Sequence, residues 1–301
     1  MRAFVEVRDI GPSFTTYDPV LGKRIRANLQ CERIAPEFRM TFRSNSLGWR
    51  GPEPDVPPTG VVLFVGDSFT MGFGVDDGEE FPQLVGKALG RPVVNMGIGG
   101  NGNARWLRLL RDEAPKFSPR QVVLQLCSND LGDNVIERLA TLGDDGAIVE
   151  HPVPPPGLAR TIQVVIDSVP GLAYSHLIGL LREFRPTPAA PPETHAPVAP
   201  NPVTNAPAAD APAPGLALTL ALVESAVRIC RERGWEPYVL SADLDPEQTR
   251  PFAELCARLE VPFVRMPSKQ ETPERYFVVD GHWNAAGHRA AADQLTAVLG
   301  R

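Results

Sequence analysis

The stretch VVLFVGDSFTMGFG, residues 61–74, decides how the rest of the chain is interpreted. Its first five residues, Val61 to Val65, are apolar without interruption, and a glycine follows at once. Such a run is typical of a buried central strand in a parallel sheet. Open α/β sheets bind their ligands at the carboxyl ends of their strands, and Ser68 lies at such an end. Ser68 is therefore a candidate nucleophile. The alternative is that it caps the helix that follows.

On both sides of this stretch, strand patterns alternate with helix patterns. Four further strands are expected, at 92–95, 121–127, 236–240 and 261–264. Helical spacing of apolar residues predicts helices at 79–89, 104–114, 215–233, 246–259 and 284–299. This alternation predicts an α/β protein with a five-stranded parallel sheet covered on both faces. The residues between 140 and 157 are rich in turn-forming types and are expected to form a loop.

Two segments stand apart from this pattern. Residues 1–58 are predicted to form an N-terminal extension that packs a small antiparallel ribbon on the main domain, residues 59–301. Within it, Trp49 and Arg50 either anchor the extension or line a substrate groove, and the first role is favoured. Residues 186–214 hold ten of the 32 prolines and no glycine, which predicts a disordered Pro/Ala-rich insertion in the domain. A lid over the active site is the alternative.

Composition excludes several classes of protein. The net charge of −6 argues against a general affinity for nucleic acid. No run of 18 apolar residues predicts a transmembrane helix, and the N-terminus lacks the apolar core of a signal peptide. The expected location is therefore cytoplasmic, or exported if a leader precedes this sequence. The four scattered cysteines indicate neither a disulfide framework nor a zinc site. Nothing in the sequence indicates an oligomeric state.

Two further strand ends carry groups that can donate hydrogen bonds to a ligand. The segment 95–102, NMGIGGNG, has four glycines, which let a backbone approach a ligand closely. A plain turn or a phosphate loop is the alternative, although the segment is not a proper GxGxxG motif. Asn129 follows the strand expected at 121–127, and an ordinary turn is its alternative role.

A base is needed to accept the proton of a nucleophilic serine, and His282 is the best placed of the five histidines. His151 and His195 lie in proline-rich stretches, His176 has no acidic neighbour, and His288 is expected to face solvent or cap a turn within the last helix.

Asp280 precedes His282 by two residues. In an extended segment, which is expected at 277–279, residues two apart point to the same side. Asp280 can then hold the imidazole in the tautomer that leaves Nε2 free for Ser68. A metal site formed by Asp280, His282 and His288 lacks a further ligand at suitable spacing.

Together these stretches resemble the sequence blocks of the SGNH/GDSL hydrolase superfamily of serine esterases and lipases. Gly66-Asp67-Ser68 matches block I, with Phe69 in place of leucine, and 95–102 matches block II. Cys127-Ser128-Asn129-Asp130 matches block III, usually G-x-N-D, with Cys127 in place of glycine. Residues 280–284 match block V, usually D-x-x-H-P-N, with a spacing one residue shorter and tryptophan in place of proline. The D-x-H-W-N form is also similar to the alginate O-acetyltransferase branch.

The resemblance implies a flavodoxin-like α/β/α sandwich and a triad of Ser68, His282 and Asp280. The shortened spacing leaves open whether a backbone carbonyl orients His282 instead of Asp280. The implied oxyanion donors are the N–H of Ser68, the N–H of Gly100 (with Gly99 as the alternative) and the amide of Asn129.

The function expected from the resemblance is hydrolysis of short-acyl, acetyl-like esters, with O-acetylated carbohydrate as a candidate substrate and no cofactor. An O-acyltransferase acting on a sugar or polysaccharide with the same residues is the alternative. A non-catalytic glycan-binding module would be expected to lack the serine, asparagine or histidine, and all three are present.

Overall fold

The computed structural model describes residues 8–10, 13–54, 60–158, 161–162, 165–166, 169 and 214–300. At its centre lies a five-stranded sheet with the strand order β12-β11-β8-β6-β7, and every pair of neighbours is parallel. The strands are β6 (Val61–Gly66), β7 (Val93–Gly97), β8 (Pro119–Cys127), β11 (Glu236–Ala242) and β12 (Phe263–Arg265). The predicted sheet is confirmed, and its order is the flavodoxin-like one.

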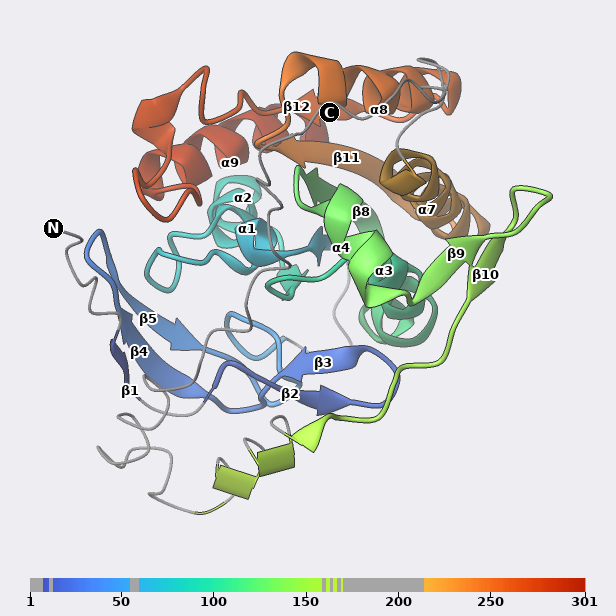
Figure 1. Ribbon diagram of the computed structural model, residues 1–301. Helices are drawn as coiled ribbons and strands as arrows, with labels where there is room; N and C mark the ends of the chain where they lie inside the picture. Colours follow the sequence, from blue (N-terminus) through green and yellow to red (C-terminus); the bar gives the residue numbers. More distant parts are fainter. Residues whose placement is uncertain are drawn as a thin grey trace, which may run out of the picture.

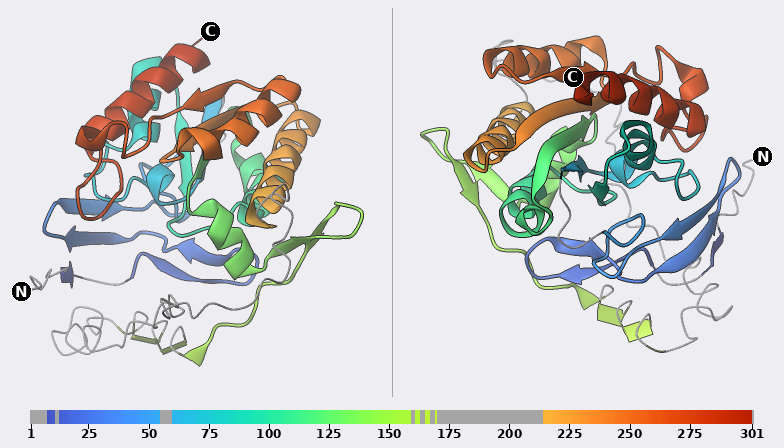
Figure 2. Two further views of the ribbon diagram at one scale, coloured as in Figure 1. Left: turned by 45° about the horizontal axis from the view of Figure 1, so that its top comes forward. Right: turned by 180° about the vertical axis from the view of Figure 1, so that it is seen from behind.

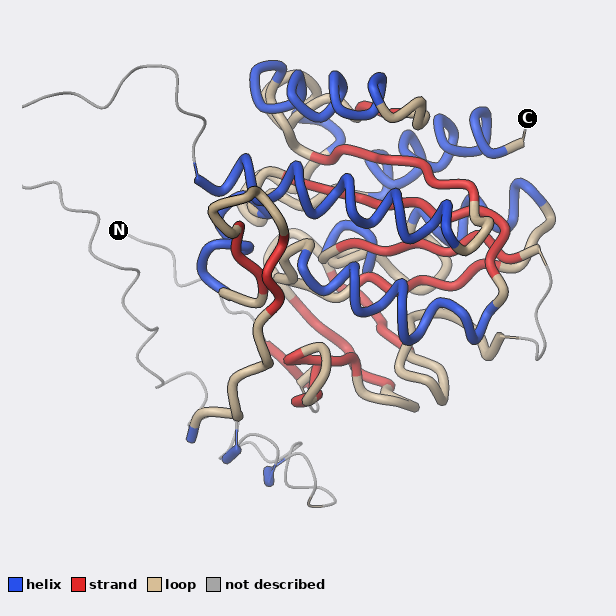
Figure 3. Tube along the Cα trace, turned by 90° about the vertical axis from the view of Figure 1, so that its right-hand side faces the viewer, coloured by secondary structure: helices blue, strands red, loops and turns tan. Residues whose placement is uncertain are grey.

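Helices cover both faces of this sheet (Figure 1). One face carries α1 (Ser68–Met71), α2 (Phe81–Leu89) and α9 (Ala285–Leu299), and the other carries α3 (Ala104–Arg108), α7 (Pro214–Glu232) and α8 (Pro246–Arg258). Beyond α3 the chain stays helical but changes type, through the π-helix η1 (Leu109–Glu113) and the 3₁₀-helix η2 (Ala114–Phe117). Figure 3 shows the strands side by side with helices in front of and behind them, which confirms the predicted three-layer sandwich.

Capping side chains fix where the helices next to the sheet begin. Asp245 accepts a hydrogen bond from the N–H of Gln248 at 2.8 Å and starts α8 with a capping box. Asn284 accepts from the N–H groups of Ala286 and Gly287, at 2.9 and 3.2 Å, and so starts α9. Since Asn284 comes two residues after His282, this cap also fixes the chain next to the candidate base.

The first residues form small antiparallel strands, as predicted. One sheet joins β1 (Arg8–Ile10), β4 (Gln30–Ile34) and β5 (Arg39–Arg43), and β2 (Thr15–Asp18) pairs with β3 (Gly22–Ile25). Both views of Figure 2 place these strands along one side of the molecule, away from α8. Three side chains of this region, Met40, Phe42 and Trp49, belong to the same buried apolar cluster as Met96 of β7. The domain boundary at residue 58 stays a prediction.

The region after β8 differs from the prediction. Residues 140–157 were expected to form a loop, yet they contain a hairpin of β9 (Ala140–Leu142) and β10 (Ile148–Glu150). Its tight turn uses Gly146 at φ +75°, and Asp145 accepts a hydrogen bond from the N–H of Ala147 at 2.9 Å. Turn-forming residues therefore marked the tip of a hairpin. The helix α4 (Asp130–Glu137) and the short 3₁₀-helix η4 (Pro273–Arg275) were not predicted.

The predicted Pro/Ala-rich insertion at 186–214 lies outside the described residues, except that Pro214 begins α7. Among the helices that the structure does describe, none combines the length and apolar character needed to cross a bilayer.

Candidate active site

Ser68 is the first residue of α1 and follows β6 directly. Because β6 lies between β7 and β8, Ser68 stands where the order of the strands reverses, the usual ligand site of an open α/β sheet. Asp67 caps α1 by accepting the N–H of Phe69 at 2.9 Å. The N–H of Ser68 itself has no acceptor within the helix. A Cβ on Gly66 would lie 2.2 Å from Thr70 Oγ1, so this close turn requires glycine.

His282 and Asp280 meet Ser68 in a continuous chain of hydrogen bonds. His282 Nε2 lies 2.7 Å from Ser68 Oγ, and His282 Nδ1 lies 2.5 Å from Asp280 Oδ1. The backbone N–H of His282 also approaches Asp280 Oδ1, at 3.3 Å. With its Nδ1–H donated to a carboxylate, an imidazole offers a free Nε2 to a serine hydroxyl. The structure therefore brings together the three side chains expected to form a triad.

The predicted reason for this meeting was wrong. Residues 277–279 were expected to be extended, but residues 278–280 form a turn. Gly281 has φ +88°, a left-handed conformation that bends the chain between Asp280 and His282. The turn closes through the N–H of Phe277, which donates to the carbonyl of His282 at 2.8 Å. A turn at Gly281, and not a strand, therefore brings the Asp280 carboxylate to the imidazole of His282 two residues later.

Aromatic rings hold the imidazole of His282. The centroids of Phe69 and Phe73 lie 5.1 and 5.0 Å from that of His282. Trp283, which is only 1% exposed, packs edge-on against Phe69 at 4.9 Å. Trp283, where block V usually has proline, is therefore a rigid buried neighbour of the histidine.

Asp280 is a carboxylate at neutral pH. Its partial burial raises its pKa, but the hydrogen bonds and charge of His282 and the charge of Arg33 outweigh this and lower the pKa below its ordinary value. A charged Asp280 accepts the Nδ1–H of His282 and favours the imidazolium that forms when His282 takes a proton.

The glycine loop after β7 lies against α1. A Cβ on Gly97 would come within 2.2 Å of the backbone nitrogen of Met71, so only glycine permits this approach. A Cβ on Gly99 would lie 3.6 Å from the Cβ of Ser68, whereas the nearest atom to one on Gly100 is Lys23 Nζ, at 3.2 Å. Gly100 has φ +61°, and its carbonyl accepts a hydrogen bond from Lys23. By this measure Gly99 lies beside the nucleophile, whereas no atom of Ser68 comes within 4 Å of the Cβ position of Gly100.

Asn129 precedes α4 at the carboxyl end of β8. Its Nδ2 donates to Asp133 Oδ2 at 2.7 Å, which leaves the second amide hydrogen for a ligand. Its Oδ1 lies 2.5 Å from the thiol of Cys127. The cysteine that replaces the family's glycine therefore contacts the amide directly, a polar role that the sequence did not predict.

Below Ser68 lies a buried acidic pair that sequence reasoning missed. Asp67 and Asp130 are each 1% exposed, and Cys127 Sγ lies 2.7 Å from Asp67 Oδ2. Burial raises the pKa of both carboxyl groups, and the charge of Asp67 raises that of Asp130 further. Burial also raises the pKa of the Cys127 thiol well above its ordinary value, so the thiol stays protonated. The available signal was an acidic residue directly after β6 and another three residues after the end of β8.

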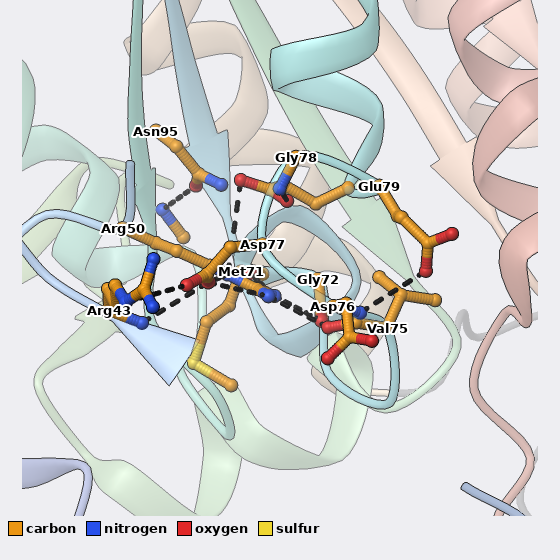
Figure 4. A network of polar contacts seen from close by, with 12 residues as sticks. Arg43, Arg50, Met71, Gly72, Val75, Asp76, Asp77, Gly78, Glu79 and Asn95 are labelled. Atoms are coloured by element: carbon orange, nitrogen blue, oxygen red, sulfur yellow. Dashed lines mark hydrogen bonds and ion pairs between the residues drawn. The ribbon is translucent and has the colours of Figure 1, made fainter. Parts of the chain in front are cut away.

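Arg50 holds the turn that follows α1 (Figure 4). Its side chain is fully buried and donates to the carbonyls of Met71, Gly72 and Val75, the last at 2.8 Å. It also pairs with Asp77 Oδ1 at 3.1 Å. Arg50 is therefore an anchor, as favoured from the sequence, and it does not line a groove.

The remaining histidines lie away from Ser68 or outside the described residues. His288 was expected to face solvent or cap a turn, and this was wrong because its side chain is 0% exposed. Burial lowers the pKa of His288 to about 3, and its Nδ1 accepts the N–H of Phe81 at 3.3 Å. His151 contacts Thr141 on the β9–β10 hairpin. His176 and His195 lie outside the described residues. Within the described ranges, no group of three His, Cys, Asp or Glu side chains could hold a metal ion.

Solved structures of three esterase-type proteins are similar to this chain. A putative lipolytic protein of the G-D-S-L family from Desulfitobacterium hafniense is 10% identical, with a TM-score of 0.47 over 80% of this chain and 99% of that one. The Pseudoalteromonas esterase EstA is 11% identical, with a TM-score of 0.45 over 80% and 100%. A carbohydrate esterase family 2 enzyme from Corynascus thermopiles (Myceliophthora fergusii) is 17% identical, with a TM-score of 0.45 over 87% and 73%. None is close enough to transfer an activity.

A comparison with curated proteins finds no match to this chain. The model of one protein family, described as GDSL-like lipase/acylhydrolase, matches residues 64–290, which is well over half of the 301 residues. This range includes both Ser68 and His282. The chain therefore belongs to the GDSL-like lipase/acylhydrolase family.

Proposed function

We propose that this chain is a serine esterase in which Ser68 is the nucleophile, His282 the general base and Asp280 the residue that orients His282. The observation that carries the proposal is the 2.7 Å contact between Ser68 Oγ and His282 Nε2, continued at 2.5 Å to Asp280. A nucleophile, its base and a group that holds the base are what acyl transfer through serine requires.

The reaction begins when Ser68 Oγ attacks the ester carbonyl carbon and its proton passes to His282 Nε2. The tetrahedral intermediate collapses, the bond to the alkoxy oxygen breaks, and the leaving alcohol takes the proton from His282. A water molecule then gives a proton to His282 and attacks the acyl-enzyme. The second intermediate releases the carboxylic acid and restores the Ser68 hydroxyl.

Negative charge on the carbonyl oxygen is stabilised by three donors in this proposal: the N–H of Ser68, the N–H of Gly100 and the amide of Asn129. The free N–H at the start of α1 and the unshared amide hydrogen of Asn129 support two of these roles. The position of Gly99 beside Ser68 keeps its N–H as the alternative to that of Gly100.

The proposed substrates are short-acyl, acetyl-like esters, with O-acetylated carbohydrate as the candidate class. This choice follows from the resemblance of the motifs, which is an argument by analogy. The acceptor that replaces water distinguishes an esterase from an O-acyltransferase. Adding free sugar to the reaction and analysing the products separates the two, because a transferase yields an acylated sugar.

Replacing Ser68 tests the mechanism. The Ser68→Ala variant should lose at least about 1,000-fold in kcat on p-nitrophenyl acetate, since the acyl-enzyme cannot form. Labelling by a fluorophosphonate should disappear with it. Full activity in this variant would overturn the mechanism. Rates over esters of rising chain length, measured beside acetylated sugars, then test the substrate class: a maximum on long acyl chains would contradict the short-acyl choice.

A further inference from the structure

The turn that carries Asp280 has little packing of its own. Val278 and Val279 are 79% and 73% exposed, and the Asp280 side chain is 28% exposed. The hydrogen bond from the N–H of Gly281 to the carbonyl of Phe277, at 3.2 Å, closes the turn on itself. Such a bond shapes the turn but does not fix it relative to Ser68. What holds the turn in place must come from elsewhere in the molecule.

Glu37, which lies between β4 and β5 in the N-terminal extension, binds this turn through three consecutive backbone N–H groups. Its Oε1 accepts from Val278 at 2.7 Å, and its Oε2 accepts from Val279 and from Asp280, at 2.8 Å each. Successive N–H groups that point to one side form an anion-binding concavity. Hydrogen bonds to an ionised carboxylate are roughly twice as strong as neutral ones.

An aromatic contact lies beside this carboxylate. The ring of Phe38 packs on the ring of Phe277, with centroids 5.0 Å apart. Phe38 also meets Phe73 edge-on at 5.4 Å, and Phe73 in turn packs on His282. Phe38 thus contacts Phe277, which precedes the turn, and Phe73, which packs on the imidazole. The segment 37–38 therefore has a defined place relative to the candidate base.

The charges around the turn are compatible with an ionised Glu37. Partial burial raises its pKa and so does the charge of Asp280, but the three N–H donors outweigh both and lower the pKa below its ordinary value. Arg33 supplies positive charge to Asp280, and Lys269 Nζ donates to the carbonyl of Val278 at 2.6 Å. The other titratable group facing Asp280 is His282.

We propose that Glu37 is a positioning residue that holds the Asp280 turn so that Asp280 and His282 stay in line with Ser68. The inference rests on the proposed function and adds a residue to it that lies outside the family-model match at 64–290. Displacing a reacting group by about 1 Å can lower a rate about 100-fold. A turn with exposed side chains depends on its backbone contacts to avoid such a displacement.

The experiment compares Glu37→Ala and Glu37→Gln with the control Glu53→Ala. Glu53 is an exposed carboxylate of the same extension that accepts a backbone N–H, from Ser46 at 2.6 Å, but does not contact the turn. We expect Glu37→Ala to lower kcat at least about 10-fold on p-nitrophenyl acetate with little change in KM, since in this proposal Glu37 binds the backbone of the turn and not the ester. Glu37→Gln should fall between the wild type and Glu37→Ala, because its single oxygen can still accept two of the three N–H groups.

Two further measurements separate positioning from a general loss of structure. Added formate is a carboxylate small enough to occupy the vacated place. It should restore part of the rate in Glu37→Ala and leave the rate of Glu53→Ala unchanged. Hydrogen exchange at the amides of residues 278–280 should accelerate in Glu37→Ala alone.

Wild-type kcat and unchanged amide exchange at residues 278–280 in a folded Glu37→Ala variant would overturn the positioning role. Failure of the proposed function appears differently: the wild type itself would be inactive and unlabelled by fluorophosphonate, while exchange at 278–280 would still report whether Glu37 holds the turn. If Glu37→Ala does not fold, kcat of Glu37→Gln decides the question: a lowered kcat supports the positioning role, and wild-type kcat overturns it.

Discussion

The turn that follows the nucleophile helix and the turn that carries Asp280 are both held by a charged side chain from the first 50 residues. Arg50 is fully buried and binds three carbonyl groups of its turn, whereas Glu37 is half-buried and binds three N–H groups. A cation thus holds one side of the candidate active site and an anion holds the other.

The difference in burial separates their expected effects. Removing a buried charge destabilises the fold, because the carbonyls and carboxylates that it bound are left without hydrogen bonds in a dry interior. A carboxylate near the surface is replaced by water at small cost, so its loss affects geometry more than stability. Mutation of Arg50 should therefore lower the free energy of unfolding, whereas mutation of Glu37 should lower kcat.

The largest effect is expected for Arg50→Met. Removing the guanidinium leaves Glu80, whose side chain is 1% exposed, without the nearby cation and leaves four carbonyls without this donor. The free energy of unfolding should fall by about 3–5 kcal/mol in urea titrations. Arg43→Met is the control, since Arg43 is 63% exposed and pairs with Asp77 only at 3.9 Å; its loss should stay under about 0.5 kcal/mol. Equal losses in both variants would erase the contrast.

The second effect concerns Asn129, which follows β8 and lies in neither of the two turns. Asn129→Ala should lower kcat about 100-fold, equivalent to roughly 3 kcal/mol of transition-state stabilisation, with a small change in KM. Asp133→Ala is the matched control, because it removes the partner of the same amide nitrogen without removing the amide. A larger loss in Asp133→Ala than in Asn129→Ala would show that the asparagine acts through α4 and not on the oxyanion.

The third effect is a pH dependence of stability from His288, whose pKa is lowered by burial and by the charges of Arg50 and His282. The native pKa is about 3, so between about pH 6.5 and 3 the unfolded chain binds a proton that the folded chain does not. The free energy of unfolding should then fall by up to about 1.4 kcal/mol for each pH unit below 6.5.

Unfolding at pH 7 and pH 5 measures this effect, which should amount to about 2 kcal/mol. His288→Gln should remove it, while His151→Gln, at a histidine on the β9–β10 hairpin, should retain it. The same pH dependence in wild type and His288→Gln would mean that His288 is not the group that titrates.

The smallest effect is expected at the second tether of the Asp280 turn. Lys269→Ala removes the donor to the carbonyl of Val278 and should lower kcat no more than about two-fold, because a partly exposed lysine with a single hydrogen bond contributes under about 1 kcal/mol. Assays beside Glu37→Ala rank the two tethers. A larger loss for Lys269→Ala would reverse the order and place the main support of the turn on the other side.

The sheet could be predicted because its strands are continuous apolar runs between turn residues. The helix α4 could not, because its two buried residues, Asp130 and Asn134, are polar and give no apolar periodicity. The burial of His288 was missed for a related reason: its nearest buried neighbours in α9, Gly287, Ala291 and Ala292, are small and mark the buried face weakly.

The residues of the candidate site likewise differ in whether local sequence indicates them. Ser68, Asn129 and His282 lie in short motifs at strand ends or before a helix, so local sequence points to them. Glu37 has no local signal, since its hydrogen-bond partners lie 241 to 243 residues further along the chain. Contacts between distant segments follow from the tertiary fold and not from the spacing of neighbours.

That separation has a consequence for synthesis on the ribosome. Glu37 is translated 241 residues before Val278, the first residue of the turn. At about 5–20 residues per second, the carboxylate waits roughly 10–50 seconds for its partner. The sheet strand β6 and the Arg50 anchor can form during that interval, whereas Asp280 and His282 are added only after it. In the proposed mechanism, a nascent chain therefore becomes reactive only after translation has passed His282.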